Sequence, residues 1–267
     1  MMKKLKDLLR FLQERGFRGL LFSALYRLNT KILKQDGTTA CINSLKFLKS
    51  FGMKYERKLE EVKPSTCWQP GKVRFILDCL KNTETIKEDI VEMGSYKGGG
   101  TIIMAEQLRA LSSSRRIFAF DSFAGFPDIS ENDRMINGNI YASTESFRDV
   151  SFRNVKKLLA LLNLDGYTKV IKGRFQQVIP TSFADEKKFS IVILDADLHD
   201  GTKFGLEFFY SRLAREGVLI LDDYCIPGEE NTSTYPGVKR AVDTFLADKP
   251  EKVIHAAHSM WYFTKQN

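Results

Sequence analysis

From residue 71 onward, short apolar runs alternate with segments in which apolar residues recur at helical spacing. Runs of this length predict strands, and apolar residues at every third or fourth position predict helices. Strands are expected to end near Met93 and to cover 115–121, 167–173, 189–197, 217–224, 251–256 and 260–265. Helices are expected over 73–83, 98–111, 147–164, 202–213 and 237–247, with a short turn or helix over 174–183.

This alternation predicts an α/β fold with a seven-stranded, mainly parallel sheet and helices on both faces, a Rossmann-like arrangement. The last two strands lie close together in the sequence, so we expect them to form an antiparallel edge. Ligands of such sheets bind beyond the carboxyl ends of the strands. The residues that directly follow each strand are therefore the candidates for function.

The N-terminal part of the chain follows a different pattern. Residues 1–70 are expected to form a basic, helical extension, and 71–267 to form the main domain. An amphipathic helix is indicated by Leu5, Leu8, Leu9 and Leu12. Residues 1–63 carry a net charge of +9, whereas the remaining 204 residues carry −1. We expect the extension to pack on the main domain or on a second copy of the chain in a homo-oligomer. Contact with an anionic membrane is the alternative.

Composition excludes several classes of protein. The chain is 43% hydrophobic and 28% charged, as globular proteins are. No apolar run approaches the roughly 18 residues of a membrane span. The four cysteines lie far apart without a CxxC pair, which disfavours structural zinc and disulfides and favours a reducing, cytoplasmic location. The balanced charge of residues 64–267 offers no track for nucleic-acid phosphates.

A glycine-rich turn follows the first predicted strand. It begins at Glu92 and contains Gly94, Ser95 and Gly98, which gives the pattern ExGxxxG. Glycines let the backbone turn sharply and approach a ligand at a helix N-terminus. A nicotinamide enzyme would instead show GxGxxG. The second strand ends in Asp121, where an acidic group can accept both ribose hydroxyls of an adenosine-type cofactor.

Four carboxylates follow two strands that should be neighbours in the sheet. Asp195 and Asp197 end the fourth strand, and Asp222 and Asp223 end the fifth. Strand residues two apart point to the same side, so these groups should converge on one rim. Uncompensated carboxylates would repel one another, and a bound divalent cation would neutralise them. Ligand sets made only of oxygen suit Mg²⁺, Ca²⁺ or Mn²⁺.

These motifs together resemble a known family. The order E-x-G-x-x-x-G, FAFDSF, KGRF, LDADL and LDDY is similar to the class I S-adenosylmethionine-dependent methyltransferases. Within them it resembles the macrocin O-methyltransferase (TylF) family of sugar O-methyltransferases, over about residues 85–265. Metal-dependent catechol-type enzymes usually carry Asp-Asn where this chain has Asp222-Asp223.

The resemblance implies S-adenosyl-L-methionine and Mg²⁺ as cofactors. It places Glu92, Gly94 and Ser95 at the methionine end of S-adenosylmethionine, with Gly98 and Asp195 also bordering it. It places Asp121 on the ribose hydroxyls, with Ser122 close by. The turn beside the adenine would be Lys172-Gly173-Arg174-Phe175.

For the metal and the reaction, the resemblance implies that Asp195, Asp222 and Asp223 ligate Mg²⁺ and that Asp197 is the general base. His199 stands where family members usually have Tyr, and is a candidate second base or substrate contact. The implied activity is methylation of a hydroxyl on a sugar or glycoside. The metal would lower the pKa of that hydroxyl, and the base would take its proton.

Two other functions stay open from the sequence. One is a catechol-type enzyme that methylates an aromatic diol, and the other is a cofactor-binding protein without catalytic activity. The presence of all four rim carboxylates disfavours the second. Two long irregular segments, 124–144 and 225–236, flank the rim. They offer Arg134, Tyr141 and Tyr235 as candidate contacts to a glycoside.

Overall fold

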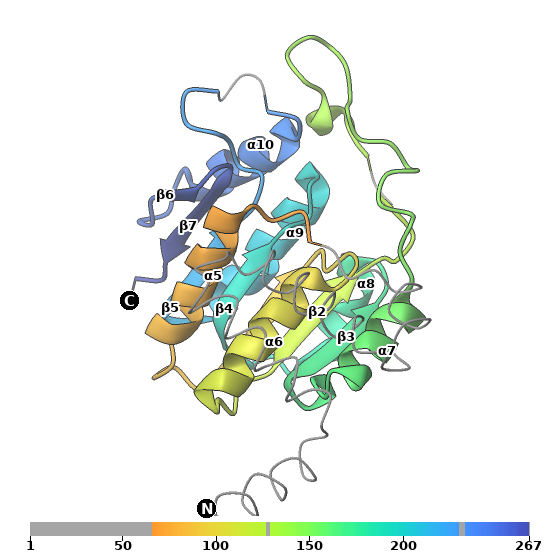
Figure 1. Cartoon of the computed structure of the whole chain (residues 1–267). Helices are drawn as coiled ribbons and strands as arrows, with labels where there is room; N and C mark the ends of the chain where they lie inside the picture. The colour runs from red at the N-terminus through yellow and green to blue at the C-terminus, as the bar shows by residue number, and fades with distance from the viewer. Residues whose placement is uncertain (1–65, 127–128, 230–232, 267) are drawn as a thin grey trace, which may run out of the picture.

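The computed structural model describes residues 66–126, 129–229 and 233–266 (Figure 1). Its strands are β1 Asp89–Met93, β2 Ile117–Asp121, β3 Thr168–Lys172, β4 Phe189–Leu194, β5 Leu213–Leu221, β6 Ile254–Ala257 and β7 Met260–Thr264. Its α-helices are α5 Pro70–Asn82, α6 Gly99–Leu111, α7 Phe152–Leu161, α8 Phe175–Val178, α9 His199–Phe209 and α10 Pro236–Leu246. Short 3₁₀ turns are η2 Glu131–Asp133, η3 Asp165–Tyr167, η4 Pro180–Ser182 and η5 Tyr210–Arg212.

The strands form one sheet in the order β3-β2-β1-β4-β5-β7-β6. The first five strands run parallel, and β7 pairs antiparallel with both β5 and β6. The predicted seven-stranded, mainly parallel sheet with an antiparallel edge is therefore confirmed. The chain order reverses at β1, whose neighbours are β2 and β4. This switch point opens a crevice above the carboxyl ends of β1 and β4.

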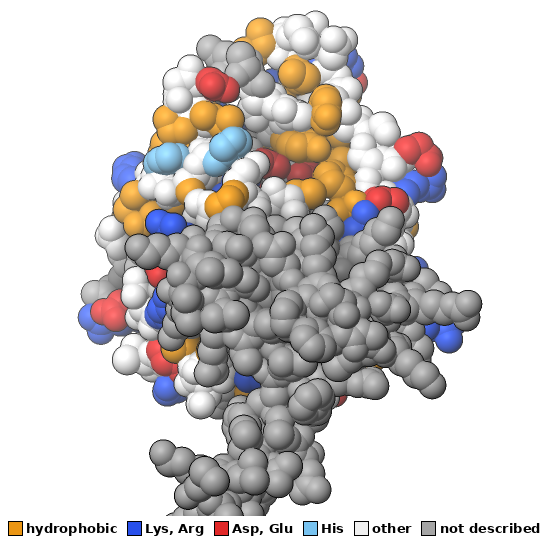
Figure 2. Space-filling model, viewed as in Figure 1, with side chains coloured by type: hydrophobic (Ala, Val, Ile, Leu, Met, Phe, Trp, Pro, Cys, Tyr) orange, Lys and Arg blue, Asp and Glu red, His pale blue; other side chains and the backbone are white. Residues whose placement is uncertain are grey.

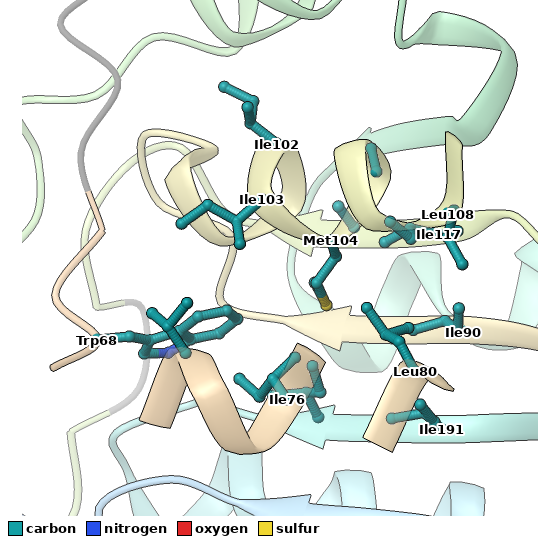
Figure 3. Packing of buried hydrophobic residues seen from close by; sticks show 14 of the residues in the cluster. Trp68, Ile76, Leu80, Ile90, Ile102, Ile103, Met104, Leu108, Ile117 and Ile191 are labelled. Carbon is teal, nitrogen blue, oxygen red and sulfur yellow. The ribbon is translucent and has the colours of Figure 1, made fainter. Parts of the chain in front are cut away.

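Helices cover both faces of the sheet because its strands are apolar on both sides. On one face, α5, α6 and α7 pack against residues such as Ile90 and Ile191. Figure 3 shows part of this cluster, with Trp68 and Ile76 below α6. On the other face, α9 and α10 pack against Val91 and Val192. Successive strand residues thus enter opposite halves of the core, as parallel buried strands require.

Several predicted boundaries differ from the structure; the strand expected to end at Asp197, for example, ends at Leu194. The helix expected over 147–164 begins only at Phe152, because Ser151 caps it by accepting a hydrogen bond from the Asn154 amide at 3.3 Å. Strand β5 begins at Leu213 rather than 217. Its first half carries polar residues and an irregular register against β4, with Glu216 at φ 62°, so no apolar run marked it.

The predictions for the basic extension lie largely outside the described residues. Just before the predicted domain boundary at residue 70, however, Trp68 is buried in the core of the main domain. Within the part of the chain that the structure describes, no helix has the length and apolar character to cross a membrane.

Candidate functional site

A cavity of about 300 Å³ lies at the carboxyl ends of the central strands. Residues that follow each of the strands β1 to β5 line it, together with the start of α5 and the segment before it. Figure 2 shows it as a hollow with acidic side chains inside and hydrophobic side chains around its mouth. Most of the residues predicted for function meet here: Glu92, Gly94, Ser95, Asp121, Ser122, Gly173, Phe175, Asp195, Asp197, Asp222 and Asp223.

The turn after β1 passes close to the turn after β4. Gly94 has φ 90°, and a Cβ built there would stand 1.8 Å from the carbonyl oxygen of Asp195. Only glycine fits here, because the backbone has a positive φ and there is no space for a Cβ atom. Gly98 also has a positive φ and directly precedes α6. The glycine pattern therefore brings the two loops together at the floor of the cavity.

Glu92 is a buried carboxyl group at the end of β1, with 1% of its surface exposed. It accepts a hydrogen bond from the Thr101 hydroxyl on α6. Burial raises the pKa of Glu92 to about 8 and nearby Asp121 adds to this, although the Thr101 hydrogen bond opposes it. Glu92 is therefore mainly protonated at neutral pH and can donate a hydrogen bond into the cavity.

Asp121 is held by the backbone at the end of β2. Its carboxylate accepts hydrogen bonds from the amides of Tyr96 at 2.8 Å and Phe123 at 2.7 Å. Burial raises the pKa of Asp121 against the effect of these two donors. Next to it, the Ser122 hydroxyl donates to the Gly125 carbonyl at 2.7 Å, which shapes the loop.

An acidic group of three residues forms the other side of the cavity. Asp195, Asp197 and Asp223 each offer a carboxylate oxygen within 4.8 Å of the other two. Burial, followed by the neighbouring carboxylates, raises the pKa of both Asp195 and Asp197 well above the usual range. Asp197 and Asp223 have φ of 57° and 53°, a conformation that strains a side-chain-bearing residue. The predicted convergence of the strand-end carboxylates is present in the structure.

Asp222 has a different environment from the other three carboxylates. It is 4% exposed and forms an ion pair with Lys72, a buried residue of α5. The Lys72 ammonium also lies 3.6 Å from Asp223. Burial lowers the pKa of Lys72, but Asp222 and Asp223 raise it more, so it stays above its usual value. The metal set predicted from the sequence included Asp222, whereas the geometry groups Asp197 with Asp195 and Asp223.

Sequence reasoning missed three contributors from residues 67–72, at the junction between the predicted extension and the main domain. The Trp68 indole donates a hydrogen bond to Asp195 at 2.8 Å, Lys72 binds Asp222, and Cys67 lines the cavity. For Lys72 a signal existed, because it lies four residues before Ile76 on the apolar face of α5. For Trp68 and Cys67 no periodic pattern was available.

Of the other residues predicted to contact the substrate, some lie at the cavity and others do not. His199 begins α9 and is not among the residues that line the cavity; its Nδ1 lies 2.7 Å from Asp200. Arg134 pairs with Glu131 on the surface. Tyr235 lines the cavity, and the exposed Tyr141 packs edge-on against it at 6.0 Å between ring centroids.

Comparisons with known proteins agree with this arrangement. The family model of macrocin-O-methyltransferase (TylF) matches residues 72–255. Mycinamicin III 3''-O-methyltransferase of Micromonospora griseorubida is 30% identical over 144 residues, 52% of this chain and 56% of that protein. Demethyldecarbamoylnovobiocin O-methyltransferase of Streptomyces niveus is 29% identical over 184 residues, 64% of each chain.

The match thus spans about half to two thirds of the length of these relatives. Among solved structures, the O-methyltransferase NovP superposes with a TM-score of 0.63 at 26% identity, covering 76% of this chain and 82% of that one. The Rossmann-like methyltransferase fold predicted from the sequence is confirmed. With a family model that matches most of its length, the chain belongs to the macrocin-O-methyltransferase (TylF) family.

Proposed function

We propose that this protein transfers a methyl group from S-adenosylmethionine to a hydroxyl of a sugar or glycoside. The observation that carries the proposal is one cavity with two chemically different sides. On one side are the glycine-rich turn and Asp121, and on the other are Asp195, Asp197 and Asp223. Family membership and the names of the two relatives, both O-methyltransferases of natural products, support the same reaction.

The first side fits S-adenosylmethionine. The Ser95 hydroxyl is buried beside the cavity and has no hydrogen-bond partner among the described residues, so a ligand atom would satisfy it. Asp121 offers a carboxylate for the ribose hydroxyls, and protonated Glu92 offers a donor. Gly173 and Phe175 border the same space from the turn after β3. When bound, the cofactor would supply a methyl group on a sulfonium sulfur, from which the thioether S-adenosylhomocysteine is a good leaving group.

The second side fits a divalent cation of the Mg²⁺ type. Its donors are all carboxylate oxygens, the ligands that this ion prefers. We assign Asp195 and Asp223 as ligands, because they belong both to the set predicted from the sequence and to the group in the structure. Asp222 is held by Lys72, which balances one of the four negative charges. When bound, the ion acts as a Lewis acid on the acceptor hydroxyl.

Asp197 is the proposed general base. It lies beside both assigned ligands, so a hydroxyl placed there is within reach of its carboxylate oxygen. That oxygen would take the proton of the acceptor hydroxyl, whose oxygen would displace sulfur from the methyl carbon and leave S-adenosylhomocysteine. Burial, followed by the neighbouring carboxylates, raises the pKa of Asp197, and a positioned carboxylate can act as a general base. The remaining task of the site is to hold the reacting atoms in line.

Methylation of an aromatic diol is the second candidate. Aromatic side chains favour it, because Phe126, Phe147 and Tyr235 line the cavity, and Phe126 packs edge-on against both of the others. A planar acceptor could pack against these rings. The same rings could equally contact the apolar face of a sugar or its aglycone.

An activity assay separates these functions. The full chain is incubated with S-adenosylmethionine carrying a labelled methyl group, Mg²⁺, and a panel of glycosides and catechols. We expect label in glycosides, lost with EDTA, and a fall in kcat of about 10²–10⁴-fold in Asp197→Asn. Labelling of catechols alone would establish the second candidate. Activity that survives EDTA would refute the metal assignment, and binding of S-adenosylmethionine without transfer to any acceptor would favour the non-catalytic protein.

A further inference from the structure

We propose that Asp133 is a positioning residue that ties one wall of the acceptor cavity to the turn carrying Asp197. This inference rests on the proposed function, because it concerns how the base is held. Asp133 lies in η2, within the segment between β2 and α7, here called the β2–α7 segment (residues 122–126 and 129–151). That segment contributes Gly125, Phe126 and Phe147 to the cavity.

Asp133 caps a helix that is remote from it in the sequence. One carboxylate oxygen accepts a 2.8 Å hydrogen bond from the amide of His199, the first residue of α9. The other accepts from the Ser130 amide at 2.9 Å and the Ser130 hydroxyl at 3.2 Å. The residue at the N-cap of α9 is Leu198, which provides no side-chain cap. A buried negative charge at this end satisfies a free N–H and interacts favourably with the helix dipole.

The β2–α7 segment also holds the residue before His199. Leu198 is buried in a small cluster with Phe126 and Ala142, against which Phe147 and Tyr235 pack. Both residues that directly follow Asp197 are therefore fixed by this segment. One is fixed by apolar packing and the other by the Asp133 hydrogen bond.

The turn at Asp197 needs such support. Asp197 has φ 57°, and the Leu198 amide folds back to the Ala196 carbonyl at 2.6 Å. A left-handed, side-chain-bearing residue persists where the surrounding structure fixes it. Helix α10 packs closely against the Asp133 side chain, because a Cβ added to Gly237 would lie 2.1 Å from the Asp133 carboxylate oxygen. Asp133 thus has little room to move away from His199.

Hydrogen exchange on the full chain, without ligands, tests this coupling directly. In Asp133→Ala we expect the amides of residues 196–201 to exchange at least about 10-fold faster, because their cap is lost. Asp133→Asn, which keeps one acceptor oxygen, should give a smaller change. Glu131→Gln is the matched control, since Glu131 lies on the same turn but is exposed and pairs with Arg134. Faster exchange confined to residues 129–135 would overturn the proposal.

Gly237→Ala perturbs the contact between Asp133 and His199 from the side of α10. The added methyl improves helix propensity in α10 but would lie 2.1 Å from the Asp133 carboxylate oxygen and 2.9 Å from the His199 amide nitrogen. We expect the amides of residues 196–201 to exchange faster in this variant. Faster exchange confined to α10 would contradict this expectation. If Asp133→Ala fails to fold, Asp133→Asn decides the question, because it keeps the size of the side chain and removes only its charge and one acceptor oxygen.

A double-mutant cycle links the contact to the reaction. We expect Asp133→Ala to lower kcat about 10-fold or more, with the affinity for S-adenosylhomocysteine within about 2-fold of wild type. In the Asp197→Asn background the same substitution should cost little, because the residue through which it acts is already disabled. An equal loss in both backgrounds would show that Asp133 does not act through Asp197. If no acceptor is methylated at all, the proposed function fails, but the exchange measurement still decides the coupling.

Discussion

The indole N–H of Trp68 donates a hydrogen bond of 2.8 Å to a carboxylate oxygen of Asp195. Trp68 precedes the first helix of the main domain, and Asp195 follows a central strand 127 residues later. The ring is 4% exposed and packs in the core below α6 (Figure 3). This tryptophan therefore orients a proposed metal ligand from a rigid position.

Trp68→Phe tests this role, because phenylalanine keeps part of the packing and removes the donor. Loss of a hydrogen bond to a charged group costs about 1.5–3 kcal/mol, so kcat/KM should fall about 10–100-fold. Trp261→Phe is the matched control, since that indole donates to the Cys225 carbonyl and does not line the cavity. Equal losses of activity in the two variants would contradict the assigned role of Trp68.

Lys72 is predicted to be needed for stability as well as for charge balance. Lys72→Met leaves Asp222 buried without a cation, which should lower the free energy of unfolding by about 3–5 kcal/mol. Lys81→Met, at an exposed ion pair of the same helix, should change it by less than about 1 kcal/mol. Urea denaturation measures both. Adding Asp222→Asn to Lys72→Met should restore most of the loss, and failure to do so would refute the pairing.

The ligand assignment predicts an order of metal affinities. Asp195→Asn and Asp223→Asn should weaken Mn²⁺ binding by more than about 100-fold. Asp222→Asn, which acts on the ion only through its neighbours, should weaken it by about 10-fold. Calorimetry or electron paramagnetic resonance with Mn²⁺ alone measures these constants. If Asp222→Asn weakens Mn²⁺ binding as much as Asp223→Asn does, Asp222 is a ligand, as the sequence predicted, and the assignment made from the structure is wrong.

The raised pKa of Glu92 predicts how the stability of the folded protein depends on pH. Its pKa is about 8 in the folded chain, against 4.5 for an ordinary glutamate. Between these values the folded protein keeps a proton that the unfolded chain has released. The stability contributed by this group is thus present below pH 4.5 and lost as the pH rises through 8. The slope is at most about 1.4 kcal/mol per pH unit.

Glu92→Gln should therefore become progressively more stable than wild type as the pH is raised from 5 to 8. Denaturation curves at several pH values give the difference. Glu207→Gln, an exposed site on α9, is the control and should run parallel to wild type. A constant offset between Glu92→Gln and wild type would show that Glu92 titrates normally.

The sheet and the strand-end carboxylates could be predicted because both depend on local pattern. Apolar runs mark β1 and β4, and the residues after parallel strands meet at one edge whatever the loops do. The contacts of Trp68 and Asp133 could not, because each depends on how an irregular segment packs on a distant element. The position of Lys72 on the apolar face of α5 was a signal, but its partner depends on how that helix packs on the sheet. For the same reason the sequence predicted Asp222 as a metal ligand together with its neighbours. The structure instead pairs Asp222 with Lys72.

The proposed function depends on the binding of S-adenosylmethionine in this cavity, through Asp121 and the adjoining turn. Titration of the full chain with S-adenosylhomocysteine in a calorimeter measures this binding without an acceptor. We predict saturable binding of one ligand per chain, weakened about 10–100-fold in Asp121→Asn, the scale for a lost charged acceptor. Asp165→Asn, at an exposed turn before β3, should bind as wild type does. Absence of binding to wild-type protein would refute the cofactor assignment, and equal binding by Asp121→Asn would refute the role of Asp121.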